Sequence, residues 1–117
     1  MKSEYDFLRY LEKIKIFHKN IVRGLGDDCA DLRFNNKNYV LTTDTSLLGP
    51  HFTKDYTPEE IGHKSLATNL SDIAAMGCIP LYALYAITLP KMSESWIKRF
   101  FRGTKKLLRE YNVSIIG

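Results

Sequence analysis

The sequence has few cysteines and no long apolar run. Its two cysteines, Cys29 and Cys78, form no CxxC pair and lie near no histidine at ligand spacing, so neither a disulfide framework nor a zinc site is predicted. The longest apolar run, 80–89, is far shorter than the roughly 18 residues that a membrane span needs. We therefore expect no membrane partner, and two reduced thiols favour a cytoplasmic protein.

A secretory signal and several catalytic motifs are also missing. Residues 1–10 carry Glu4 and Asp6 where a signal peptide needs an apolar core, so no signal peptide is predicted. The sequence contains no G-x-x-x-x-G-K-[ST] phosphate-binding loop and no recognisable Ser/His/Asp nucleophile set. No residue is therefore assigned as a catalytic base or nucleophile.

What is present fits an ordinary folded domain. The 117 residues are 44% hydrophobic and 26% charged, enough for one domain with a modest core. The net charge of +4 owes much to a basic cluster in 98–109. These cations fall mainly opposite the apolar stripe of a predicted helix, as on a solvated face, and no nucleic-acid-binding motif accompanies them. We expect no nucleic-acid partner, although binding that collapses with salt and needs no Mg²⁺ would revive that hypothesis.

The first part of the chain predicts a helix and a hairpin. Apolar residues at helical spacing after Ser3, a plausible N-cap, predict a helix over 3–17. Residues 18–30 show no clear period and are interpreted as a loop. Two strands, 32–34 and 39–43, flank the turn formers between them, which predicts a hairpin whose second strand ends at Asp44.

The second part alternates helices and strands. A T-x-x-E capping box from Thr57 to Glu60, with proline at the first helical position, predicts a helix that stops at Gly77. Its small residues would let another backbone approach closely; they are Ser65, Ala67, Thr68, Ala74 and Ala75. A strand over 81–89, apolar on both faces, is expected to be central or to lie in a dimer interface. A helix follows over 93–111, with Trp96, Ile97, Phe100, Leu107, Leu108 and Tyr111 inward, and a strand over 113–116. The order α-β-β-α-β-α-β predicts an α/β (α+β) domain.

Three short segments could carry chemistry. The first is Gly24-Leu25-Gly26-Asp27-Asp28-Cys29-Ala30, in which two adjacent carboxylates repel each other unless a cation such as Mg²⁺ lies near. The alternative, favoured when this segment is taken alone, is a solvated turn, because Gly and Asp are common turn formers.

The second segment is Thr42-Thr43-Asp44, at the predicted end of a strand. Ligands of α/β sheets gather beyond such ends, and a carboxylate with two hydroxyls could bind a metal directly or through water. Equally, Asp44 could cap the following turn.

The third segment runs from Asn69 to Gly77. Asn69 and Asp72 are three residues apart and therefore share a helix face. Asp72 lies in a mostly apolar stretch, where a carboxylate is costly unless it is paired or binds a metal. We favour a functional role over an exposed carboxylate on the polar side.

Together these segments place four carboxylates on three separate stretches. Mg²⁺ bound to nucleotide phosphates uses few carboxylates per ion, so four could support more than one ion. Several ions that neutralise charge are one way to transfer a phosphoryl group without covalent catalysis.

The three segments, in this order, resemble the thiamine-monophosphate kinase family. That family belongs to the ATP-dependent superfamily of aminoimidazole ribonucleotide synthetase, selenophosphate synthetase and the hydrogenase maturation factor HypE. The matching blocks are G-x-G-D-D-x-A at Gly24–Ala30, T-D-T-L-x-x-G-x-H-F-like residues at Thr43–Phe52, and N-L-S-D-[IL]-A-A-M-G-x-x-P at Asn69–Pro80. The resemblance covers nearly the whole chain.

The resemblance implies roles for individual residues. Mg²⁺ would be ligated by Asp28, Asp44 and Asp72, with help from Thr42 and Thr43, and Asp27 would be a more distant or further ligand. Gly26 and Asn69 would contact the nucleotide, and His51 would contact the thiamine phosphate. The implied reaction transfers the γ-phosphoryl group of ATP to thiamine monophosphate, giving thiamine diphosphate, by direct in-line transfer.

The family also implies a homodimer, paired through the sheets of its N-terminal domains. Family members continue past Ile115-Ile116-Gly117 with a G-D-T stretch and a second domain. We expect residues 1–117 to be an N-terminal Mg·ATP-binding domain that lacks its last portion and the C-terminal domain, with weak or no kinase activity alone. Two alternatives stay open: another ATP-dependent member of the superfamily, and a non-catalytic dimerisation or nucleotide-binding module.

Overall fold

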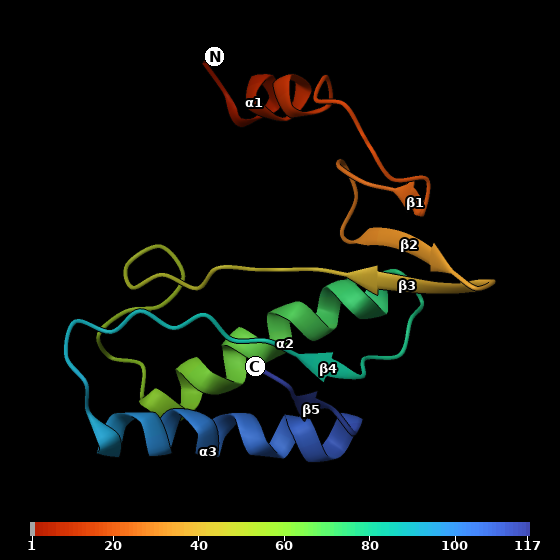
Figure 1. The fold of residues 1–117 in the computed structure, drawn as a ribbon. Coiled ribbons are helices and arrows are strands. Elements are labelled where there is room, and N and C mark those ends of the chain that lie inside the picture. Colours follow the sequence, from red (N-terminus) through yellow and green to blue (C-terminus); the bar gives the residue numbers. More distant parts are fainter. Residues whose placement is uncertain (1) are drawn as a thin grey trace. The chain divides into compact units, whose positions relative to one another are not determined.

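The computed structural model describes residues 2–117, which form two compact units. The first unit ends at Thr42, and the second comprises Thr43–Gly117. The helices and strands, in chain order, are α1 (Glu4–Leu11), β1 (Ile21–Arg23), β2 (Ala30–Phe34), β3 (Lys37–Leu41), α2 (Pro58–Ala75), β4 (Tyr82–Ala83), α3 (Glu94–Tyr111) and β5 (Ser114–Ile115) (Figure 1). The predicted mixture of helices and strands is confirmed, with one more strand than expected.

Helix α1 is shorter than the sequence predicts. Ser3 caps it as expected, its Oγ accepting a hydrogen bond of 3.2 Å from the Asp6 main-chain N–H. The expectation that the helix reaches residue 17 is wrong. After Leu11 the chain forms tighter i→i+3 turns, with Ile14 N–H donating to Leu11 O at 2.9 Å. The apolar residues beyond that point are exposed and give the helix no face to pack.

The first unit also contains an antiparallel sheet in the order β1-β2-β3. The predicted hairpin is confirmed between β2 and β3, where Asn35 and Asn36 form a two-residue turn with φ of 48° and 62°. The interpretation of 18–30 as loop throughout is wrong for β1, which pairs with β2 through an irregular register. So short a strand forms by pairing with a distant segment, which periodicity does not report. Strand β3 ends at Leu41 rather than at Asp44.

In the second unit, helices α2 and α3 pack against each other (Figure 1). Both helix starts are confirmed: Thr57 and Glu60 form the capping box, and Ser93 caps α3. A Cβ atom on Gly103 would lie 1.9 Å from the Glu59 carbonyl oxygen, so the backbones touch there. Gly62 and Gly103 therefore allow the close approach of α2 and α3.

The core of the second unit is small and partly aromatic. Its buried residues include Ile61, Leu66, Phe100 and Leu107, with Thr104 fully buried among them. Phe100 stacks on Trp96 with ring centroids 5.3 Å apart and meets Phe101 edge-on at 5.1 Å. The expectation that Tyr111 faces inward is wrong, because 48% of its surface is exposed at the last turn of α3.

Strands β4 and β5 form a parallel pair whose ladder extends from Leu81 to Tyr85. Ser114 N–H donates to Leu81 O at 3.0 Å, and Tyr85 N–H donates to Gly117 O at 2.9 Å. The predicted strand over 81–89 is therefore regular over only part of its length, because its partner β5 is short. Its outer side chains are not covered by this chain: Leu84 is 75% exposed.

Among the helices of residues 2–117, none combines the length and the apolar character that crossing a bilayer requires.

Candidate functional site

The acidic loop of the first unit joins β1 to β2. Gly26 has a φ of 97°, a backbone conformation that glycine adopts without a Cβ penalty. Asp27 forms an ion pair with Arg23, and its Oδ1 accepts a 2.8 Å hydrogen bond from the Asp28 main-chain N–H. The Arg23 hydrogen bond, followed by that N–H, lowers the pKa of Asp27. The protein itself therefore supplies one cation to the pair of carboxylates.

The side chain of Asp28 is exposed, and the residue is held in place through its main-chain carbonyl group. The Thr42 hydroxyl donates a 3.1 Å hydrogen bond to the Asp28 carbonyl oxygen, which ties the acidic loop to the residue after β3. Thr42 thus orients Asp28 within the first unit. The adjacent Cys29 is buried, with 3% of its surface exposed, and anchors this end of the loop.

Thr43 and Asp44 begin the second unit, and both are exposed. Asp44 Oδ1 accepts a 2.8 Å hydrogen bond from the Thr45 main-chain N–H. One carboxylate oxygen therefore caps the local turn, as one of the two sequence interpretations predicts.

Asn69 and Asp72 lie on the second half of α2, and both are half-buried. Asn69 Nδ2 donates a 2.9 Å hydrogen bond to Ser65 O one turn earlier, which fixes its side chain along the helix. Asp72 is therefore not fully exposed on the surface of α2, and its functional role stays a prediction.

His51 lies in the loop that precedes α2. Its Nδ1 accepts a 2.8 Å hydrogen bond from the Leu47 main-chain N–H, and its carbonyl oxygen accepts one from Lys64 Nζ. The side chain is exposed and oriented by the backbone of its own loop.

The predicted metal ligands are divided between the two units. Asp27 and Asp28 belong to the first, and Asp44 and Asp72 to the second. Within residues 2–117, no group of three or more His, Cys, Asp or Glu side chains is arranged to hold a metal ion. The shared magnesium site therefore stays a prediction.

A match to a known family decides the classification. Residues 26–117 match the family described as AIR synthase related protein, N-terminal domain. This chain belongs to that family. The match begins at Gly26, in the acidic loop, and covers every other candidate site residue.

Several curated relatives of this AIR synthase related chain are named thiamine-monophosphate kinase. The relative from Buchnera aphidicola subsp. Acyrthosiphon pisum is 37% identical over an alignment of 117 positions, which covers 98% of this chain and 36% of the relative. The relative from Buchnera aphidicola subsp. Schizaphis graminum is 41% identical over an alignment of 119 positions, gaps included, which covers 97% of this chain and 37% of the relative. The chain thus spans a little over a third of the length of these relatives.

The fold agrees with solved structures of the same kind. A structure described as AaThiL complexed with AMPPCP and TMP superposes with a TM-score of 0.80 at 32% identity, covering 97% of this chain and 34% of that one. The predicted resemblance and fold class are confirmed.

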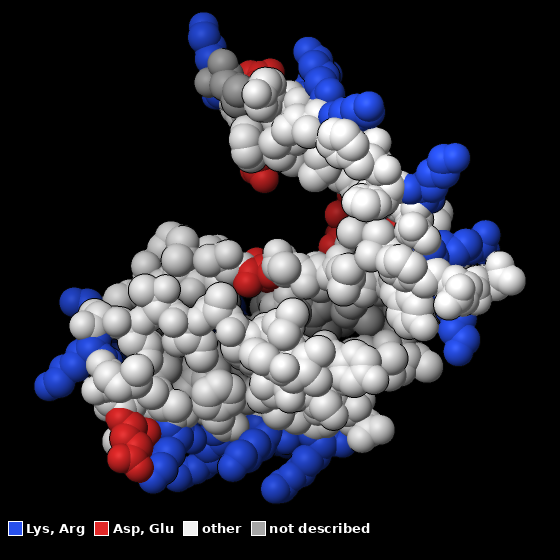
Figure 2. Space-filling view, viewed as in Figure 1, with Lys and Arg blue, Asp and Glu red and all other residues white. Residues whose placement is uncertain are grey.

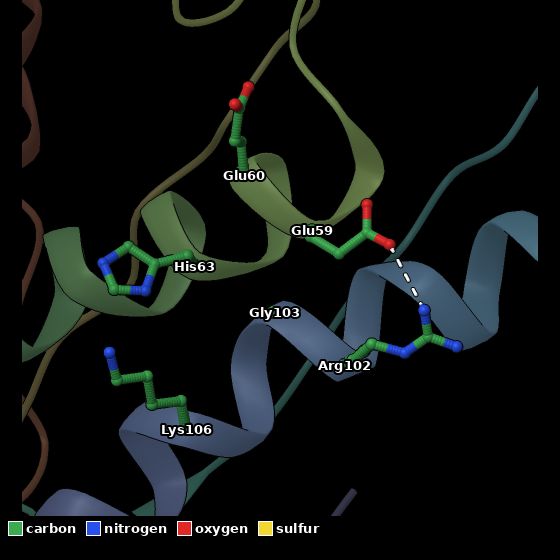
Figure 3. Close-up of a pocket in the computed structure, with 6 residues that line it drawn as sticks. All are labelled: Glu59, Glu60, His63, Arg102, Gly103 and Lys106. Carbon is green, nitrogen blue, oxygen red and sulfur yellow. Dashed lines mark ion pairs between the residues drawn. The ribbon is translucent and has the colours of Figure 1, made fainter.

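A shallow, open depression lies elsewhere, between α2 and α3 (Figure 3). Its lining residues are Glu59, Glu60, His63, Arg102, Gly103 and Lys106. Glu59 Oε1 lies 2.9 Å from Arg99 Nε and 3.7 Å from Arg102 NH1, and the Arg99 hydrogen bond is the main cause that lowers the pKa of Glu59. None of the predicted site residues lines this depression, and both of its carboxylates already have partners, Glu59 with Arg99 and Glu60 with the Thr57 main-chain N–H.

Two residues that orient the candidate site were not found from the sequence. Arg23 precedes Asp27 by four residues, a spacing that brings the side chains of a tight turn together. Lys64 precedes the Asn69 segment on α2 but contacts a loop 13 residues earlier. The first contact carried a local signal, whereas the second depends on how the loop folds back on the helix.

Proposed function

We propose that this chain is the N-terminal, Mg·ATP-binding part of a thiamine-monophosphate kinase. In the proposed reaction the γ-phosphoryl group of ATP is transferred to thiamine monophosphate, giving thiamine diphosphate. The observation that carries the proposal is the match, over 97% of this chain, to a structure whose description includes AMPPCP and TMP. AMPPCP is an ATP analogue, and TMP in that context denotes thiamine monophosphate.

The residues present suit Mg²⁺ as the accompanying ion. The proposed ligands are Asp28, Asp44 and Asp72, with Thr42 and Thr43, and all offer the hard oxygen atoms that Mg²⁺ prefers. When bound, the ion would neutralise charge on the phosphates. Asp27 is better suited to a supporting role, because its charge is balanced by Arg23.

The remaining roles follow from position. Gly26, with its positive φ, lets the backbone of the acidic loop approach a nucleotide phosphate, and Asn69 offers an amide from α2. His51 is proposed to contact the phosphate of thiamine monophosphate. Because the chain spans 36% of the first relative's length, we propose that the rest of such a protein supplies the remaining active-site residues. Residues 1–117 alone would then show weak or no phosphoryl transfer.

We also propose a cytoplasmic homodimer. Dimerisation is supported by the exposed apolar side chains around β4, where Ile79 is 81%, Tyr82 67% and Leu84 75% exposed. A cytoplasmic location is supported by the use of ATP and by the two cysteines, neither of which forms a disulfide.

The alternatives are weighed by particular observations. The relatives' names favour the thiamine kinase over the selenophosphate synthetase and HypE types. Lys and Arg side chains gather along the lower edge of Figure 2, where Figure 1 places α3. Part of the positive charge on this face is balanced within the protein, because Glu94 pairs with Lys98 and Glu59 pairs with Arg99. This internal pairing argues against nucleic acid as the ligand.

Ligand selectivity tests the proposal. Saturation-transfer NMR with the 117-residue chain should detect thiamine monophosphate and AMPPCP, each in the presence of Mg²⁺, and thiamine much more weakly. A folded chain that binds AMPPCP but not thiamine monophosphate would point to another member of the superfamily. A folded dimer that binds neither would support the non-catalytic dimerisation module.

A further inference from the structure

The loop that carries His51 is closed on itself by its own backbone. Gly49 N–H donates to Phe52 O at 2.7 Å, and His51 N–H donates to Leu47 O at 3.1 Å. Gly49 has a φ of 101°, which lets the chain reverse at this point without strain. The loop therefore has a defined conformation that does not depend on a ligand.

The same loop fixes the proton on the imidazole ring of His51. The Leu47 main-chain N–H can only donate, so Nδ1, 2.8 Å away, must be the unprotonated nitrogen. In a neutral imidazole the proton then resides on Nε2. In the described part of the chain Nε2 has no hydrogen-bond partner, and the side chain is exposed, so His51 offers one directed N–H donor to solvent or to a ligand.

Lys64 attaches this loop to α2. Its Nζ donates to the main-chain carbonyl oxygen of His51 and lies 5.3 Å from the centroid of the Tyr56 ring. The Tyr56 ring in turn lies 6.4 Å from that of Phe52. One ammonium group thus contacts the loop at two points, by a charge-assisted hydrogen bond and by a cation–π interaction.

Helix α2, which carries Lys64, is held in place by its packing against α3. Lys64 lies in the second turn of α2, just after the capping box of Thr57 and Glu60. Two residues before it, Gly62 packs directly against the backbone of α3, since a Cβ atom there would lie 2.0 Å from Phe100 O. The position of Lys64 is therefore set by the packed helix pair and not by the loop that it holds.

We propose that Lys64 is a positioning residue that holds the His51 loop on α2, so that His51 presents Nε2–H as a hydrogen-bond donor to an anionic oxygen of a phosphate monoester. For the identity of the ligand, this inference rests on the proposed function. It adds that Lys64 positions the loop and that the His51 ring carries its proton on Nε2. A phosphate oxygen accepts from such a donor without any proton transfer. A pre-oriented donor avoids the entropic cost of ordering the loop when the ligand binds.

NMR of the imidazole nitrogens in the ligand-free 117-residue chain tests the inference. Long-range ¹H–¹⁵N spectra should show His51 as a single Nε2–H tautomer, with the Leu47 amide protected from hydrogen exchange. Lys64→Met should give averaged tautomers and reduce Leu47 protection by at least about tenfold, the effect of a lost charge-assisted hydrogen bond. Lys64→Arg, which keeps a donor and a cation, should restore both signals.

Lys54→Met is the matched control, because it removes an exposed lysine next to the same loop and should change neither signal. An Nδ1–H tautomer in the parent chain, or a Lys64→Met variant of normal circular dichroism with unchanged His51 and Leu47 signals, would overturn the inference. None of these measurements contains substrate. Their failure is therefore separate from failure of the proposed function, which appears as absent binding of thiamine monophosphate.

Discussion

A Cβ atom placed on Gly62 of α2 would lie 2.0 Å from the carbonyl oxygen of Phe100 on α3, which is far inside contact distance. The two helices therefore pack backbone to backbone, and the pair provides the support on which Lys64, Asn69 and Asp72 are carried. Since the obstructing atom belongs to a main chain, a side chain at this position cannot be accommodated by a rotamer change.

Gly62→Ala should therefore destabilise the second unit by about 1–3 kcal/mol or more, the cost typical of forced overpacking. Denaturant unfolding followed by circular dichroism measures this change. Gly24→Ala is the matched control: its Cβ would meet only Ile21 Cγ2, at 3.7 Å, and the change should fall within about 0.5 kcal/mol of the parent. Equal effects of the two substitutions would argue against backbone contact between α2 and α3.

The start of α2 depends on its reciprocal cap. Glu60 N–H donates to Thr57 Oγ1 at 3.1 Å, and Thr57 N–H donates to Glu60 Oε2 at 3.0 Å. Thr57→Ala should lower the free energy of unfolding by about 0.5–2 kcal/mol. Thr53→Ala, in the preceding loop, removes a hydroxyl that caps no helix and should be nearly neutral. A Thr57→Ala variant as stable as the Thr53→Ala variant would show that the cap contributes nothing.

Acid should weaken the link between α2 and α3 through Glu59. Its pKa is lowered in the folded state, chiefly by the Arg99 hydrogen bond, so its stabilising effect is present above the pKa of an unfolded glutamate, about 4.3. That effect is lost as the pH falls through the folded-state value. Glu59→Gln should therefore lower the melting temperature at pH 7 and make little difference near pH 2. A difference that persists undiminished at pH 2 would exclude this ion pair as the cause.

The exposed apolar side chains near β4 predict self-association. Leu84→Asp places a charge on a side chain that is 75% exposed, so it should leave the monomer folded and weaken a dimer formed there by at least about tenfold. Sedimentation equilibrium measures the dissociation constant. Met92→Asp, on a side chain 79% exposed outside the strand, is the control. A parent chain that is monomeric at high concentration would contradict the proposed dimer surface.

Local signals in the sequence predicted the parts of the fold that local chemistry determines. The Thr57–Glu60 box and the start of α3 at Ser93 are where the sequence placed them, and the hairpin turn lies within the predicted turn formers, because each is set by neighbouring residues. The misses involve contacts between distant residues. Strand β1 exists through pairing with β2, and α1 ends where its apolar residues have no surface to cover.

The candidate site shows the same division. The acidic loop, the Thr42–Asp44 turn and the Asn69–Asp72 pair were singled out from residue types and spacing, and their joint role as a site stays a proposal. The ion pair of Arg23 with Asp27 and the hydrogen bond from Lys64 to the His51 loop were not predicted. The first had a local signal in its four-residue spacing, whereas the second depends on how the loop folds back on α2. The ion pair with Arg23 distinguishes Asp27 from Asp28, to which the resemblance had also given different expected roles.

The most direct test of the central claim is a calorimetric titration of the 117-residue chain with AMPPCP, with and without Mg²⁺. Asp72→Asn and Asp55→Asn are run beside the parent, the second replacing an exposed carboxylate outside the candidate site. We predict binding that requires Mg²⁺, that persists in Asp55→Asn and that weakens at least about tenfold in Asp72→Asn. Binding that is indifferent to Mg²⁺, or that both variants retain equally, would contradict an Mg·ATP site built on these carboxylates.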